Sequence, residues 1–319
     1  MTGRAPLAGL KEKRTYSSRV RLCSMNESHP SELLIRQRLL ALTRTLPSAR
    51  NGDVTAIHQA RVATRRMRAA LPIVTRGSKC RKLTKVVSRL TRALGVVREH
   101  DVALLTLDEL ASDASVSRES VDLLRTILME ERDRLFADMA LEIERVNLEK
   151  FQRKALAAAH CLVDGRAPAL SDPKRLRTVI KRAIRRALAL QVAIDNAGGI
   201  YLPDRLHQVR IAVKKLRYVL EVARDLSRSR ASARIRMLKS AQDLLGRMHD
   251  FEMLIMRIRA LQGSDRAPTL KVSADLDRLV RRLEMECRQL HVRYMGFKKK
   301  LLELCDYVTS AADRPASAA

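Results

Sequence analysis

Apolar residues recur along most of the chain at spacings of three and four, which is the pattern of amphipathic helices. The pattern predicts helices at 31–46, 55–75, 79–98, 101–111, 118–160, 173–196, 204–226, 231–248, 250–261 and 273–308. Gly, Pro, Asp and Ser residues gather in the breaks between these ranges, as is typical of turns. No segment alternates convincingly between apolar and polar positions, so we expect an all-α fold.

The composition agrees with helices around a real core. The 319 residues include 46% hydrophobic side chains but only 11 Gly and 9 Pro. Residues 1–28 are basic and residues 310–319 are rich in Ala and Ser, and neither segment has helical periodicity, so we expect two disordered tails. No stretch approaches the roughly 18 apolar residues of a membrane span, and the N-terminus lacks the apolar core of a secretory signal.

The chain contains an internal duplication. Residues 57–74 read IHQARVATRRMRAALPIV and residues 206–223 read LHQVRIAVKKLRYVLEVA, with six of eighteen positions identical. A second pair follows in the same order, LGVVREHDVALL at 94–105 and LGRMHDFEMLI at 245–255. The two pairs are offset by 149 and 151 residues, which indicates a tandem repeat. We therefore expect one helical-bundle repeat at 29–160 and a second at 161–309.

Charge narrows the choice of partner. The 63 Lys and Arg residues exceed the 35 Asp and Glu residues and give a formal net charge of +28. Repulsion on that scale favours a partner of opposite sign, and nucleic acid, an anionic membrane and inorganic polyphosphate all qualify. The alternative is a basic surface that is merely solvated.

The duplicated helix carries the charge on one face. On a helical wheel, its apolar residues fall on one side and its cationic residues on the other. No acidic residue falls within 57–71 or 206–220, although like charges at helical spacing repel by a few tenths of a kcal/mol per pair. A bound polyanion would remove this repulsion, and residues about 5–6 Å apart along a helix can follow a linear polymer. The predicted anion-binding residues are His58, Arg61, Arg65, Arg66 and Arg68 in the first copy and His207, Arg210, Lys214, Lys215 and Arg217 in the second.

The two histidines lie near the predicted starts of their helices. Thr55 and Asp204 are candidate N-caps, which would place His58 and His207 in the first turn beside free backbone N–H groups that favour phosphate. The alternative is that each histidine caps or packs a helix end. Secondary candidates are Lys82, Lys85, Arg89 and Arg92, then Lys181 and Arg185, and finally Arg98 and His249, which Asp101 or Asp250 could instead hold in structural ion pairs.

Catalytic and metal-binding patterns are missing from the sequence. The five cysteines are scattered without a Cys-x-x-Cys pair, which favours a reducing, cytoplasmic location, and the histidines lack metal-ligand spacing. There is no Gly-rich phosphate loop and no carboxylate cluster on the cationic faces. We expect no catalytic residue, no metal and no cofactor. Nucleic acid is the secondary alternative as partner, and an aromatic content of 3% argues against base stacking.

Four segments together resemble a known family. HQARVATRRMR (58–68), LGVVREHDV (94–102), LHQVRIAVKKLRY (206–218) and LGRMHD (245–250) are similar to the motifs of the CHAD family, the conserved histidine α-helical domain. The resemblance covers about residues 30–308. It implies two helical bundles related by a pseudo-two-fold axis, with inorganic polyphosphate bound in a basic channel between them by the ten residues of the duplicated face.

The same resemblance implies association with polyphosphate granules. Many relatives carry an additional strand-rich triphosphate-tunnel domain, whereas nothing in this sequence could form one, so we expect a stand-alone member. Glu99 and His100 depart from the Asp and Leu that are usual in the family, which leaves the packing near Arg98 open.

Overall fold

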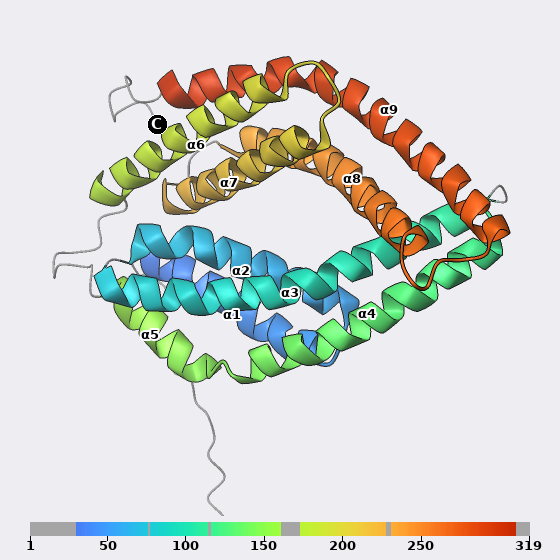
Figure 1. Ribbon diagram of the computed structural model, residues 1–319. Coiled ribbons are helices and arrows are strands. Elements are labelled where there is room, and N and C mark those ends of the chain that lie inside the picture. The colour runs from blue at the N-terminus through green and yellow to red at the C-terminus, as the bar shows by residue number, and fades with distance from the viewer. Residues whose placement is uncertain (1–29, 76, 114–115, 161–172, 228–230, 311–319) are drawn as a thin grey trace, which may run out of the picture.

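The computed structural model describes residues 30–75, 77–113, 116–160, 173–227 and 231–310 (Figure 1). Within these ranges the chain forms helices and no strand, which confirms the all-α prediction. The helices are α1 Pro30–Arg50, α2 Val54–Val74, α3 Gly77–Ala111, α4 Arg118–Glu144, α5 Leu148–His160, α6 Pro173–Ala197, α7 Pro203–Ser227, α8 Ser232–Gln262 and α9 Leu270–Thr309. Both predicted tails lie outside the described residues, apart from Ser310.

Several predicted boundaries are wrong. The segments predicted as separate helices at 79–98 and 101–111 form the single helix α3, and those at 231–248 and 250–261 form α8, because no Gly or Pro interrupts either junction. The long helix predicted at 118–160 divides into α4 and α5. There the Asn147 side chain accepts a hydrogen bond from the Lys150 N–H at 2.8 Å and begins a new helix.

The predicted N-cap Thr55 is also wrong, because α2 begins at Val54 and its N-cap is Asp53. Gly52 adopts a φ of 90°, a left-handed conformation that suits glycine, and turns the chain between α1 and α2. The Asp53 carboxylate then accepts a hydrogen bond from the Ala56 N–H at 2.5 Å. In the second copy α7 begins at Pro203, so Asp204 lies inside the first turn.

The same neighbour relations occur in both parts of the chain. Helices α1–α4 pack consecutively on one another, and helices α6–α9 do the same in the other half of the molecule (Figure 1). Across the middle, α2 packs against α7 and α3 against α8. The halves also differ, because α6 packs along α9 whereas α5 covers both α1 and α3. The pseudo-two-fold axis and the two domain ranges remain predictions.

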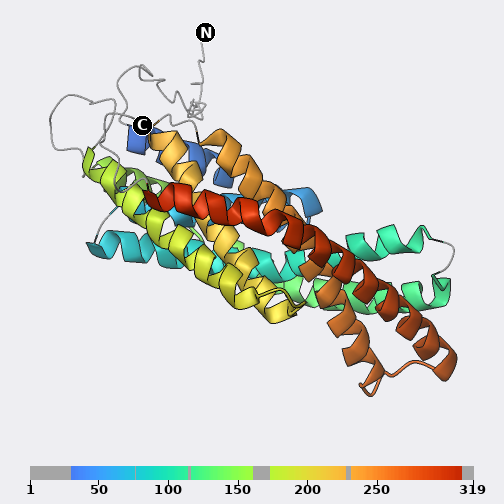
Figure 2. The same ribbon diagram turned by 90° about the horizontal axis from the view of Figure 1, so that it is seen from above.

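The duplicated helices place their apolar faces in the core as the wheel predicts. Ile57 and Met67 of α2 and Val209 and Leu216 of α7 are all buried among Leu, Ala and Val side chains. With those faces buried, the opposite faces of α2 and α7 turn toward the middle of the molecule. At one end, the connected ends of α3 and α4 and of α8 and α9 extend beyond the central region (Figure 2). Among the described helices, none is long and apolar enough to cross a bilayer.

Candidate anion-binding site

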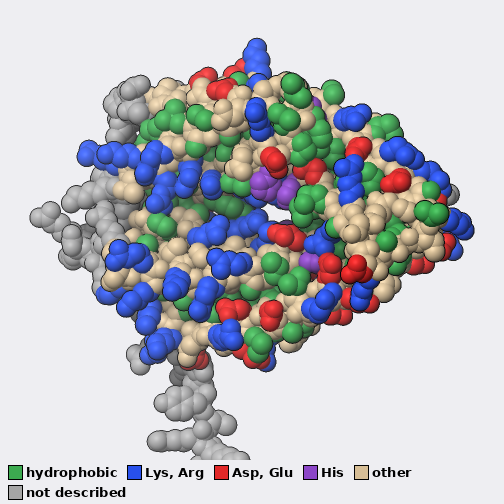
Figure 3. Space-filling view, viewed as in Figure 1, with side chains coloured by type: hydrophobic (Ala, Val, Ile, Leu, Met, Phe, Trp, Pro, Cys, Tyr) green, Lys and Arg blue, Asp and Glu red, His purple; other side chains and the backbone are tan. Residues whose placement is uncertain are grey.

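A cavity of about 330 Å³ lies in the middle of the molecule, between α2 and α3 on one side and α7 and α8 on the other. Figure 3 shows an opening there, with Lys and Arg side chains on much of its border and histidine at its edge. The lining residues are His58, Arg61, Arg65, Arg98, Glu99, Val102, Ala103, Arg210, Lys214, Gln242, Asp243, Gly246, Arg247, His249, Asp250, Met253 and Arg257. The cavity therefore joins the two repeats that the sequence predicts.

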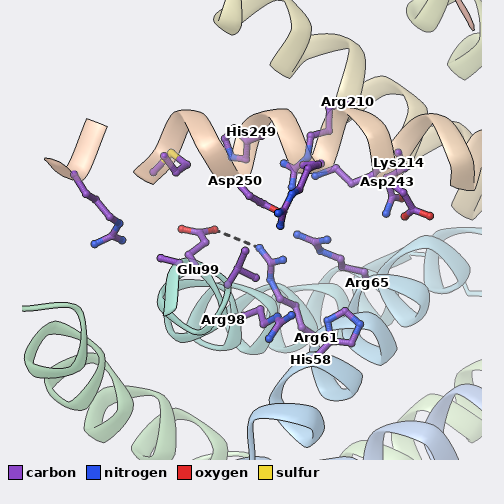
Figure 4. Close-up of a pocket in the computed structure, with 17 residues that line it drawn as sticks. His58, Arg61, Arg65, Arg98, Glu99, Arg210, Lys214, Asp243, His249 and Asp250 are labelled. Atoms are coloured by element: carbon purple, nitrogen blue, oxygen red, sulfur yellow. Dashed lines mark hydrogen bonds and ion pairs between the residues drawn. The ribbon is translucent and has the colours of Figure 1, made fainter. Parts of the chain in front are cut away.

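Four cations from duplicated positions meet in this cavity. Arg61 and Arg65 are one turn apart on α2, and Arg210 and Lys214 are one turn apart on α7 (Figure 4). Burial, together with the positive charge of Arg210 and Arg65, lowers the pKa of Lys214 to about 6. Burial and the neighbouring Arg65 lower the pKa of Arg61 to about 10. The crowding of these basic groups in the cavity thus disfavours their charged forms, and nearby acids only partly offset that effect.

Two of these arginines keep unused hydrogen-bond donors. The Nε atoms of Arg61 and Arg210 are both buried and have no hydrogen-bond partner in the structure. Each guanidinium packs against a glycine of the helix that follows in the chain, α3 for Arg61 and α8 for Arg210. A Cβ at Gly95 would come 3.5 Å from Arg61 Nε, and one at Gly246 would come 4.0 Å from Arg210 Nε. The glycine of the second repeated motif therefore packs against the arginine of the first motif in both halves of the molecule.

Acidic side chains also line this cavity, beside the cations. Glu99 accepts a hydrogen bond from Arg61 Nη2 at 3.3 Å, and Asp243 and Asp250 face the cavity from α8 (Figure 4). Burial raises the pKa of Asp250, while Arg210 and His249 oppose that shift. Glu99 belongs to α3, and Asp243 and Asp250 belong to α8, so these acids lie outside the duplicated helices α2 and α7. In the described parts of the chain, no group of three or more His, Cys, Asp or Glu side chains is arranged to hold a metal ion.

The duplicated histidines occupy different surroundings. His58 lines the cavity, and burial together with Arg98 and Arg61 lowers its pKa. His207 does not line the cavity directly. Its Nδ1 lies 3.2 Å from Nδ1 of His249, which does line it. Burial lowers the pKa of His207, and electrostatic repulsion from His249, followed by Arg210, lowers it further.

The prediction that His58 and His207 lie in the first helical turn, beside free backbone N–H groups, is wrong. Because α2 begins at Val54 and α7 at Pro203, His58 and His207 are each the fifth helical residue. The free N–H groups of a helix are those of its first four residues. Any contact from His58 or His207 to an anion must therefore come from the imidazole ring.

Four of the ten predicted ligand residues lie elsewhere on the duplicated helices. Arg66 and Arg217 both bond to Glu221, Arg66 through Nε at 3.0 Å and Arg217 through Nη1 at 3.0 Å. Arg217 and Glu221 are buried, so this group joins α2 to α7 and does not line the cavity. Arg68 and Lys215 are exposed and also do not line it.

The secondary candidates separate into three groups. Arg98 and His249 line the central cavity, and Asp101, which sequence reasoning offered as a partner for Arg98, bonds instead to Arg132 Nε at 2.7 Å. Lys82 and Arg89 line a separate groove along α3. The remaining four, Lys85, Arg92, Lys181 and Arg185, are exposed and do not line the central cavity.

The unusual His100 connects three helices. Its Nδ1 lies 2.9 Å from the carbonyl oxygen of Val96, and its Nε2 lies 3.0 Å from Glu131 Oε2 on α4. Glu131 also accepts a hydrogen bond from Arg257 Nη1 of α8 at 2.6 Å. Burial acts to raise the pKa of Glu131, but His100 and Arg257 outweigh burial and lower it. Because Arg257 lines the central cavity, His100, which replaces the Leu that is usual in the family, helps to hold one wall of that cavity in place.

Comparison with known proteins agrees with the sequence motifs. The family model described as CHAD domain matches residues 33–259. The crystal structure of the CHAD domain from the plant Ricinus communis is similar, with a TM-score of 0.63 and 20% identity over 85% of this chain and 92% of that one. PptA from Streptomyces chartreusis is similar with a TM-score of 0.55 and 18% identity, over 89% of this chain and 97% of that one. At such identities the two structures show a shared fold. No curated protein sequence matches the chain significantly.

Proposed function

The chain belongs to the CHAD domain family, and on that premise we propose that it binds inorganic polyphosphate in the central cavity without catalysing a reaction. The observation that carries this proposal is the meeting of Arg61, Arg65, Arg210 and Lys214, from the same positions of the two repeats, in one cavity. Burial and mutual repulsion lower the pKa values of Arg61, Arg210 and Lys214, and an anion between α2 and α7 would relieve that repulsion. A phosphate oxygen accepts strong hydrogen bonds from guanidinium groups.

The arrangement of the cations suits a chain of phosphates better than a single phosphate ion. Arg61 and Arg65 follow α2, while Arg210 and Lys214 follow α7 on the facing side. Residues one turn apart on each helix are about 5–6 Å apart. Successive phosphates of a linear polymer can therefore meet successive cations from alternate sides of the cavity.

A polymer longer than the central cavity needs a further surface, and His58 borders one. The same histidine lines a second cavity of about 390 Å³, formed by α1 and α2, to which Arg38, Arg44 and Arg66 contribute. Arg38 is paired with Asp225 and Arg66 with Glu221, whereas Arg44 is exposed. We propose that a long chain leaves the central cavity on this side, away from the acidic residues Glu99 and Asp250.

Nucleic acid fits this lining less well. The described residues around the central cavity include no Phe or Tyr on which a base could stack. A polyphosphate chain offers the same backbone charge without bases, so it can occupy a lining of this kind. We therefore keep nucleic acid as an outcome of the test.

Two of the three acidic residues that line the cavity are already engaged with cations. Glu99 bonds to Arg61, and Asp250 interacts with Arg210, His249 and Arg247. Phosphoanhydride hydrolysis would require carboxylates that are free to hold Mg²⁺ near the phosphates. We propose that these acids limit where phosphate can lie in the cavity. We also propose that the protein stores or scaffolds polyphosphate, in association with granules. Release of phosphate from polyphosphate in the presence of Mg²⁺ would contradict the non-catalytic role.

The direct test compares three ligands at equal phosphate concentration and physiological salt. We expect long-chain polyphosphate to bind more tightly than tripolyphosphate, because only the long chain can extend beyond the cavity. We expect duplex DNA to be displaced by long polyphosphate. Equal affinity for duplex DNA and polyphosphate, with no displacement, would contradict the proposed function.

A further inference from the structure

Another concave surface, separate from both cavities described above, lies between α3 and α5. The junction of α4 with α5 also contributes to it. This groove has a volume of about 550 Å³. Its lining residues are Lys79, Lys82, Leu83, Val86, Arg89, Arg145, Val146, Asn147, Lys150, Phe151, Lys154 and Ala157. None of them lines the central cavity. Substitutions at residues that line the groove therefore leave every residue that lines the central cavity unchanged.

The floor of the groove is apolar. Leu83 and Phe151 are buried members of the core, Val146 is buried between α4 and α5, and Val86 packs against the same core. Ala157 is exposed at one end. A volume of this size falls within the range of about 300–1,000 Å³ that is typical of small-molecule sites. The floor thus offers an apolar surface to a ligand that can displace water from it.

The rim of the groove is cationic on both sides. Lys79 and Lys82 project from α3, and Lys150 and Lys154 project from α5; all four are exposed. No ion pair joins these lysines to any residue in the described ranges. Glu142 bonds to Arg145 Nη1 at 2.6 Å and lies 3.7 Å from Arg89 Nε, but Glu142 itself does not line the groove. A ligand with an anionic group would meet no acid in this lining.

We propose that this groove binds a single-chain anionic amphiphile, with its alkyl chain on the apolar floor and its phosphate, sulfate or carboxylate head among the lysines. An inorganic anion would meet the rim but leave the floor in water. A neutral or cationic hydrocarbon would cover the floor but leave the lysines unneutralised. Only a ligand with both parts matches both surfaces. This site is independent of polyphosphate binding in the central cavity.

The test is calorimetric titration of the full chain with dodecyl phosphate below its micelle concentration. We expect saturable binding with one ligand per chain. Dodecyltrimethylammonium, which has the same chain and the opposite charge, and inorganic phosphate, which has no chain, should show no saturable binding at the same concentrations. Equal binding of dodecyltrimethylammonium, or displacement of dodecyl phosphate by equimolar inorganic phosphate, would overturn the proposal.

Two variants separate the groove from general attraction to a basic surface. Ala157→Trp places a bulky side chain at one end of the groove and leaves all of its cations in place, while Lys82→Glu with Lys150→Glu reverses two charges of the rim. We expect each variant to weaken dodecyl phosphate binding by about tenfold or more. The matched control, Arg281→Glu with Lys299→Glu, reverses two exposed cations of α9 and should change the affinity less than about twofold.

An unchanged affinity in Ala157→Trp would contradict the groove as the site. The variant Arg61→Glu with Arg210→Glu, which alters the central cavity, should retain dodecyl phosphate binding. Loss of polyphosphate binding in that variant therefore tests the central cavity alone, and loss of dodecyl phosphate binding in it would contradict the independence of the two sites.

Discussion

The guanidinium of Arg61 lies directly over Gly95, so that a Cβ at residue 95 would come 3.5 Å from Arg61 Nε. Arg210 and Gly246 repeat this relationship at 4.0 Å in the other half of the molecule. The two arginines belong to one repeated motif and the two glycines to the other. The two repeated motifs are therefore in contact with each other in both halves of the molecule.

The effect of replacing Gly95 on polyphosphate affinity should depend on the size of the new side chain. Gly95→Ala brings a methyl group into ordinary van der Waals distance of Arg61 and should leave the affinity for polyphosphate nearly unchanged. Gly95→Leu should displace Arg61 from the cavity and weaken binding by about tenfold, since one charged hydrogen bond is lost. Calorimetric titration with long polyphosphate measures both, and circular dichroism checks that the helices remain. Equal affinities for the two variants would show that the close approach does not position Arg61.

Binding should take up protons through Lys214. In the free protein this lysine has a pKa of about 6, so it is mostly neutral at pH 7.5. A polyanion beside it raises the pKa, and the bound lysine is charged. Between these two pKa values the complex holds more protons than the free protein, so affinity should fall as the pH rises above about 6. Titrations in HEPES and Tris, which differ in ionisation enthalpy, should report uptake of up to about one proton.

Lys214→Gln is the control for proton uptake. This variant should bind more weakly, and its apparent binding enthalpy should depend less on the buffer. His58 and His207, whose pKa values are also lowered, account for the uptake that remains. Identical buffer dependence in the parent protein and in Lys214→Gln would exclude the lysine as the group that gains the proton.

Glu221 should be important for stability. It holds both Arg66 and Arg217 at the contact between α2 and α7, and its side chain is 4% exposed. Glu221→Ala leaves the buried Arg217 without its partner and should lower the free energy of unfolding by about 3 kcal/mol. Urea denaturation measures the loss. Glu99→Ala is a suitable comparison, because Glu99 is 52% exposed and should contribute less than about 1 kcal/mol.

The parts of the site that follow from helical periodicity could be predicted from the sequence. The apolar stripe fixes which face of α2 and α7 is buried, and so it predicts that Arg61, Arg65, Arg210 and Lys214 share the opposite side. The repeat predicts that two such faces exist. Their meeting in one cavity requires the packing of α2 on α7, which the resemblance to the CHAD family implied and the residue pattern alone did not.

The remaining contacts depend on packing between helices that are distant in sequence. Arg66 and Glu221 are 155 residues apart, and no local pattern indicates that they meet. The same is true of Glu131 and Arg257, which are 126 residues apart. For Arg217 the sequence does contain a local signal of an ion pair, since Glu221 follows it by one helical turn. At the start of α2, both Asp53 and Thr55 are good caps, and periodicity could not choose between them.

The central claim is that paired cations of the two repeats hold polyphosphate between them. The most direct test is the affinity of Arg61→Glu with Arg210→Glu for long polyphosphate, measured beside Arg281→Glu with Lys299→Glu, which has the same net charge. We expect the cavity variant to lose about a hundredfold or more, because two charged hydrogen bonds become repulsive contacts. We expect the α9 variant to lose less than about threefold. Equal losses in the two variants would contradict the claim, since binding would then follow net charge and not the cavity.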